Sequence, residues 1–130
     1  MLILTIRTDK PEAEIGLFED DKKLAYVTWQ AHRHLSETIH SKINDLLETE
    51  QKDWSKLRAI VAFQGPGSFT GLRIGLTVAN ALAASLNIPI VASQSDDWVK
   101  LGIKALINSQ NNRQVLPEYG SVAHITKQKK

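Results

Sequence analysis

The sequence predicts one α/β domain, built from a mixed β-sheet with helices on its faces. Two observations support this prediction. Three short apolar segments come first, separated only by turn residues, which is typical of an antiparallel meander. Two further apolar strands then alternate with segments of helical periodicity, which indicates parallel β-α-β crossovers. A chain of 130 residues is long enough for one such core.

The elements follow from the local patterns. Leu35, Ile39 and Ile43 recur at helical spacing, whereas Leu24–Trp29 alternates with apolar side chains on both faces, as in a strand inside a covered sheet. In order, the sequence predicts strands at 2–8, 13–18 and 21–29, a helix at about 34–50, a strand at 59–63, a helix at about 70–86, a strand at 88–92 and a helix ending near 107. Residues 108–113 read as a polar loop, and a short tail follows from about 114 within the single domain 1–130. This order is typical of one ribonuclease-H-like or actin-like lobe.

The bulk composition excludes several classes of protein. Hydrophobic residues make up 42% of the chain and charged residues 23%, and the net charge of +2 does not by itself indicate nucleic-acid binding. The absence of cysteine excludes disulfides and thiol chemistry. No apolar run is long enough to cross a membrane, and no leader pattern is present. We therefore expect a cytoplasmic protein without membrane contact.

A glycine-rich corner joins the strand at 59–63 to the helix at 70–86. The string GPGSFTG places little side-chain bulk at this turn, and the helix start offers free N–H groups to an anion. Gly65, Gly67, Ser68 and Thr70 are thus candidate nucleotide-binding residues. The alternative is a sharp corner whose glycines only permit close packing.

Other catalytic patterns are not supported. The corner lacks the lysine of a phosphate-binding P-loop, because Leu72 and Arg73 follow Gly71. The flanks of Ser68 do not match a nucleophile elbow. His32, His34 and His40 lack the spacing of a helical metal-ligand pair, so we expect no metal and no catalytic residue.

The helix at 70–86 carries one charged residue, Arg73. Gly71, Gly75, Ala79 and Ala83 fall four apart and give one smooth face that lets another backbone approach. A helix this low in charge is expected to be covered by its own domain on one side and by a further protein surface on the other.

The string GPGSFTGLRIG, after an apolar strand and before an Ala- and Leu-rich helix and IPIVASQS, closely resembles the TsaB (YeaZ) family. The hairpin at 2–18, the pair His34–Leu35 and the closing segment Leu116–Tyr119 extend the likeness over nearly the whole chain. The resemblance implies an actin-like fold and the role of a non-catalytic scaffold. Such a subunit pairs with a TsaD-type catalytic subunit and a TsaE-type ATPase, and contacts tRNA only through this complex. The complex places a threonylcarbamoyl group on N6 of adenosine 37.

The resemblance also implies where the partner binds. In the family the first two helices form the pairing surface and can instead form a homodimer. Here these are the helices at 34–50 and 70–86. The expected interface residues are His34, Leu35, Ile39, Ile43, Gly71, Leu72, Gly75, Leu76 and Ala79.

Three departures from the family argue against nucleotide hydrolysis. Members are usually close to twice this length, and the second lobe is missing between about Ile107 and Leu116. Arg7 stands where the first strand normally carries a metal-binding aspartate, and Gln64 replaces an arginine. Because a cation cannot ligate Mg²⁺, we expect no cofactor, except ATP or ADP at the seam of the complex. Two alternatives stay open: a nucleotide-binding actin-like protein that uses the loop 65–71, and a stand-alone homodimer with another role.

Overall fold

The computed structural model describes residues 1–67 and 69–118, and these form one five-stranded sheet covered by helices on both faces. Ser68, Tyr119 and the lysines near the end of the sequence lie outside the described residues. The elements are β1 (Leu2–Arg7), β2 (Glu12–Glu19), β3 (Lys22–Gln30), α1 (Leu35–Thr49), β4 (Leu57–Phe63), α2 (Phe69–Leu86), β5 (Ile90–Ser93) and α3 (Trp98–Ile107). Two short 3₁₀ turns, η1 (His32–His34) and η2 (Trp54–Lys56), precede α1 and β4. The predicted order of strands and helices is confirmed.

The strands lie in the order β3-β2-β1-β4-β5. β1 pairs antiparallel with β2, and β2 with β3, so the first three strands form the predicted meander. β1–β4 and β4–β5 pair in parallel, as the crossovers require. β1 is therefore the central strand, and its carboxyl end lies beside that of β4.

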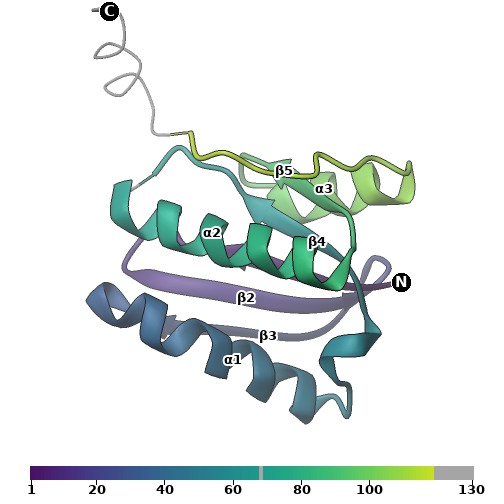
Figure 1. Cartoon of the computed structure of the whole chain (residues 1–130), viewed down its shortest axis with the longest axis horizontal. Helices are drawn as coiled ribbons and strands as arrows, with labels where there is room; N and C mark the ends of the chain where they lie inside the picture. Colours follow the sequence, from purple (N-terminus) through teal and green to yellow (C-terminus); the bar gives the residue numbers. More distant parts are fainter. Residues whose placement is uncertain (68, 119–130) are drawn as a thin grey trace, which may run out of the picture.

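Helices cover the two faces of the sheet unequally. Figure 1 shows α1 and α2 side by side on one face and α3 on the other. Leu4 and Ile6 of β1 belong to the larger core beneath α1 and α2, whereas Ile3 belongs to the smaller core beneath α3. Each such fully buried side chain contributes about 1.5–3 kcal/mol. This explains why β1 is apolar at nearly every position.

Three element boundaries or environments differ from those predicted. β4 begins at Leu57, because Leu57 already pairs with Leu2. β5 begins only at Ile90, since Pro89 lies outside the strand and offers its carbonyl to the N–H of Ile60 at 3.0 Å. β3 is an edge strand with half-buried side chains, not a strand inside a covered sheet. Several of its apolar side chains, such as Val27 and Trp29, are partly buried against the core beneath α1.

Residues 111–118, called the strap here, form no helix or strand but are fixed along β5 and α2. Side-chain oxygens of Asn111 and Asn112 accept the N–H groups of Ile90 and Ala92 at 3.2 and 2.7 Å, so they occupy the outer edge of β5. Further along, the amide of Asn80 makes two 2.8 Å hydrogen bonds with the backbone of Val115, which is buried. The segment predicted as a tail from about 114 thus packs on the domain as far as it is described.

No helix in the described part of the chain is long and apolar enough to cross a bilayer.

Candidate functional site

The glycine-rich corner is filled by the chain itself. Gly65 has φ +123°, and a Cβ there would collide with the carbonyl oxygen of Glu118 in the strap. A Cβ at Gly67 would collide with the side chain of Asp9 and lie 3.0 Å from its Cα. The N–H of Glu118 donates to the carbonyl of Gln64 at 2.8 Å, which holds the strap against this corner. The glycines permit close packing between chain segments, which agrees with the interpretation of this turn as a sharp, packed corner.

The described candidate nucleotide-binding residues therefore do not form an open cradle within the corner. Gly65 and Gly67 face other backbone, and Thr70 is exposed in the first turn of α2. Ser68 lies outside the described residues. Nothing in this arrangement adds support for phosphate binding at the corner itself.

Arg7 ends β1 beside this corner, at the position where the family normally has its aspartate. Its guanidinium makes two hydrogen bonds to the carboxylate of Asp9, Nε–Oδ1 at 2.7 Å and Nη2–Oδ2 at 3.2 Å. It also lies 3.9 Å from the ring centre of Phe63, the last residue of β4. The hydrogen bond to Asp9 raises the pKa of Arg7 despite its partial burial. A fixed cation thus occupies the carboxyl edge of the two central strands, where it opposes a metal ion.

A second polar pair lies on the same face of the sheet. The hydroxyl of Tyr26 on β3 donates to Glu14 of β2 at 2.6 Å. Burial, and after it the hydrogen bond to Glu14, raises the pKa of Tyr26 strongly.

This shift makes a prediction for alkaline stability. An unfolded tyrosine ionises near pH 10, whereas folded Tyr26 keeps its proton to higher pH. A raised pKa contributes stability that is complete below about pH 10 and is lost as the pH rises above it, by at most about 1.4 kcal/mol per unit. Urea unfolding between about pH 8 and pH 11 should show this decline in the native chain and a flatter profile in Tyr26→Phe. Equal slopes in the two proteins would contradict the assignment.

The predicted partner residues on α1 and α2 mostly lie in the domain's own core. The relative exposure of Leu35, Ile39, Ile43, Leu72, Leu76 and Ala79 is 3% or less. Gly75 is buried too, and a Cβ there would lie 2.8 Å from both Cβ and Cγ2 of Thr8 on the chain just after β1 and collide with its hydroxyl. Gly75 on the smooth face of α2 therefore admits Thr8 of the same chain, and the named side chains are covered by the domain's own core. Of the predicted set, only His34 is exposed and Gly71 half-buried.

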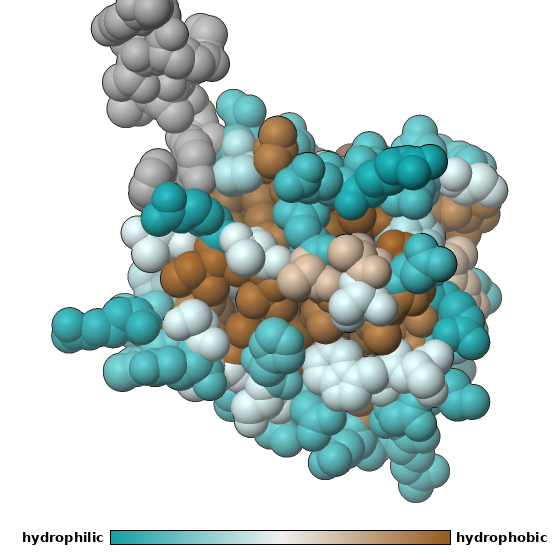
Figure 2. Space-filling view, in the orientation of Figure 1, coloured by the Kyte–Doolittle hydropathy of each residue, from teal (hydrophilic) through white to brown (hydrophobic). Residues whose placement is uncertain are grey.

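The outward side of α2 is formed by Gly71, which belongs to the predicted interface set, and by three residues that do not belong to it. We call the half-buried or exposed residues Gly71, Ile74, Val78 and Ala81 the α2 stripe. Their spacing of three and four places them on one side of the helix. Figure 2 shows a hydrophobic band over α2 in the view of Figure 1, with hydrophilic residues around it. Apolar surface with polar residues around it makes this stripe a candidate interaction site. The low charge of the helix indicated such a face, but not which side it occupied.

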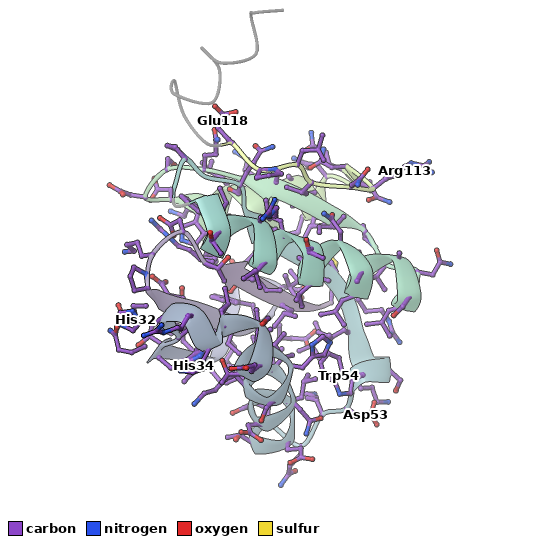
Figure 3. All side chains as sticks on the ribbon, turned by 60° about the vertical axis from the view of Figure 1, so that its left-hand side comes forward. His32, His34, Asp53, Trp54, Arg113 and Glu118 are labelled. Carbon is purple, nitrogen blue, oxygen red and sulfur yellow. The ribbon has the colours of Figure 1, made fainter. Side chains whose placement is uncertain are left out.

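His32, His34 and His40, the histidines among the described residues, do not come together as a metal site. His34 Nδ1 lies 2.8 Å from Glu37 Oε1, and the His40 ring lies 6.1 Å from that of Trp54. Figure 3 shows His32 and His34 at the N-terminal end of α1, away from Trp54. Within the described residues, no three histidine or carboxylate side chains come together to hold a metal ion.

Comparison with known proteins supplies a family context for this geometry. The family model described as "TsaD: tRNA N6-adenosine threonylcarbamoyltransferase" matches residues 27–103. The chain is 41% identical over 99 residues to the tRNA threonylcarbamoyladenosine biosynthesis protein TsaB of Bacillus subtilis. The aligned residues cover 73% of this chain and 42% of that protein. The chain thus spans about two-fifths of the length of this relative.

Solved structures give the same result. YeaZ from Pseudomonas aeruginosa superposes with a TM-score of 0.66 and 27% identity, over 72% of this chain and 43% of that one. RuvC from Thermus thermophilus superposes with a TM-score of 0.52 and 10% identity, over 95% of this chain and 89% of that one, a likeness of fold alone. Together they confirm the predicted ribonuclease-H-like, actin-like lobe.

Proposed function

The chain belongs to the TsaD family, among its TsaB (YeaZ) members, and from this premise we propose that it is a non-catalytic subunit in the synthesis of N6-threonylcarbamoyladenosine at position 37 of tRNA. Its relatives carry the name of that biosynthesis. We place its action in the cytoplasm, as part of a protein assembly that modifies tRNA.

One observation carries the proposed role. The α2 stripe is an apolar face on a helix whose single charged residue is Arg73. A partner that covers Ile74, Val78 and Ala81 removes apolar area from water, which stabilises the complex by about 25 cal/mol per Å² of that area before the costs of association. A charged surface at the same place would weaken the complex, because its charges would have to lose their water on binding. A second helical protein of the same family suits this face, because α1 and α2 lie side by side there (Figure 1) and another pair of helices can pack against them.

The proposed partner is a TsaD-type catalytic subunit. A TsaE-type ATPase would join the assembly, and tRNA would be reached through the complex. In the absence of the catalytic subunit the same stripe can bring two copies of this chain together. A second copy of this chain is thus the alternative partner for the α2 stripe.

The site at the end of β1 supports a role without catalysis. Arg7 and Asp9 form a salt bridge with each other, so the carboxylate of Asp9 is not available to hold a magnesium ion against a phosphate. The packed glycine corner lies directly beside them. We infer that any ATP or ADP in the assembly is held mainly by another subunit.

The test is a reconstituted modification assay. The chain is supplied in place of full-length TsaB, together with the TsaD-type and TsaE-type proteins, and threonylcarbamoyladenosine in tRNA is measured. We expect the chain to co-elute with the TsaD-type subunit and to raise the yield above that of the two proteins alone. Co-elution without any gain in yield would limit the role to binding. Failure to co-elute would contradict the proposal.

A further inference from the structure

A pocket of about 740 Å³ opens between the turn after β1 and the starts of α1 and α2. Its walls come from residues 10–11, 31–35 and 70–74, three segments that are far apart in the sequence. Thr70 and Gly71, at the end of the glycine-rich corner, form part of its α2 wall. His32 and His34, which are labelled in Figure 3, line the pocket on the side of α1.

Backbone hydrogen bonds fix these walls to one another. The carbonyl of Pro11 accepts the N–H groups of Ala31 and His32 at 2.9 and 3.1 Å, which ties the β1–β2 turn to the turn before α1. The hydroxyl of Thr8 donates to the carbonyl of Gly71 at 2.8 Å, which ties the end of β1 to the start of α2. The pocket is therefore already shaped before any ligand arrives, and little ordering entropy remains to oppose binding.

The lining is cationic. Lys10, Arg33 and two histidines line the pocket, and no carboxylate is among its described lining residues. Two acids close to these residues in sequence have partners of their own: Asp9 binds Arg7 at 2.7 Å, and Glu37 binds His34 at 2.8 Å. Within the described part of the chain, Lys10 and Arg33 take part in no salt bridge. Two positive charges thus line one cavity without a salt-bridge partner among the described residues.

We propose that this pocket binds phosphates of an RNA backbone. Lys10 and Arg33 would each pair with a phosphate oxygen, while the apolar side of Ile74 supports the sugar side of the strand. The open shape of the pocket favours a strand that passes over it rather than a free nucleotide, because small-ligand sites enclose most of their ligand. The inference rests on the proposed function for its choice of RNA. The inference goes beyond the proposed function because it makes this chain itself a contact of tRNA. The pocket adjoins the α2 stripe, since Gly71 and Ile74 belong to both the pocket and the stripe.

The experiment compares two matched pairs of substitutions. Lys10→Gln with Arg33→Gln removes the pocket cations, and Lys100→Gln with Lys104→Gln removes two exposed cations from α3 on the other face. Binding of fluorescently labelled tRNA to the full chain is followed by anisotropy at several salt concentrations. The pocket variant should bind on the order of tenfold more weakly or worse. Its plot of log affinity against log salt should be shallower by about two, one for each lost phosphate contact. The α3 variant should keep the native affinity and slope.

Several results would overturn the proposal. These are an unchanged slope in the pocket variant, an equal loss in the α3 variant, and a native chain without measurable tRNA binding. Displacement of tRNA by free ADP, but not by an unlabelled RNA hairpin, would assign the pocket to a nucleotide and reject the RNA backbone. Co-elution of the same variants with the TsaD-type subunit is measured in parallel. A native chain that fails to co-elute counts against the proposed function alone, whereas the salt slopes judge the pocket.

Discussion

Replacing Gly75 by alanine is expected to destabilise the domain by about 2 kcal/mol or more, even though alanine is the better helix former. The propensity gain is about 1 kcal/mol. Against it, the new Cβ would lie 2.8 Å from both Cβ and Cγ2 of Thr8 and would collide with its hydroxyl. Overpacking of this kind costs about 1–3 kcal/mol, and displacing the Thr8 hydroxyl from Gly71 leaves a buried polar group unpaired at a further cost of about 1–3 kcal/mol. Packing therefore outweighs propensity.

Urea unfolding of five proteins tests the cause of this loss: the native chain, Thr8→Ala, Gly75→Ala, the double variant and the control Ala84→Ser. In Thr8→Ala with Gly75→Ala, the colliding hydroxyl and methyl are gone, so the double variant should be less destabilised than the sum of the single changes. Ala84→Ser, at an exposed position of the same helix, should change stability by less than about 0.5 kcal/mol. Strict additivity of the two changes would show that Gly75 does not pack on Thr8.

Replacing Ala81 by arginine is expected to disrupt pairing with the TsaD-type subunit without unfolding the domain. Ala81 is exposed on the α2 stripe, so a long charged side chain is tolerated in the free protein. In the complex the same charge must be desolvated within an apolar interface. Interface substitutions of this kind cost at least about 2 kcal/mol, which is roughly thirtyfold in affinity. Co-elution and titration with the TsaD-type subunit measure the loss.

The matched control lies on the opposite face of the sheet. Leu101 of α3 is a 50% exposed leucine, and Leu101→Arg introduces the same charge there. We expect this variant to pair normally and to unfold at the same urea concentration as Ala81→Arg. If Leu101→Arg loses the partner and Ala81→Arg keeps it, the interface lies on α3 and the α2 stripe has another role.

Much of the fold was predictable from local sequence patterns. Period-two and helical-period repeats located every strand and helix to within a few residues, because side-chain direction follows directly from local backbone geometry. The edges of elements were less predictable. β4 starts early because Leu57 has a distant partner in Leu2, and β5 starts late because Pro89 precedes it.

The candidate site was predicted less well, for a specific physical reason. A stripe of small residues on α2 predicts that some backbone approaches closely, but it does not say which one. The structure places Thr8 of the same chain against Gly75, so this side of α2 packs on its own domain, whereas Ile74 and Val78 are half-buried and Ala81 is exposed. The same ambiguity affected the corner at 65–71, where Glu118 packs against Gly65 and Asp9 packs against Gly67.

By itself, then, the sequence determined the order of the elements, the family through GPGSFTGLRIG, and the presence of one helix too low in charge to lie free in water. Only the tertiary structure decided which face of that helix is available, and that Lys10, Arg33 and the start of α2 surround one pocket. Periodicity is a local property of the chain. Which surfaces face one another depends on contacts between residues that are tens of positions apart, such as Pro11 with Ala31 and Thr8 with Gly71.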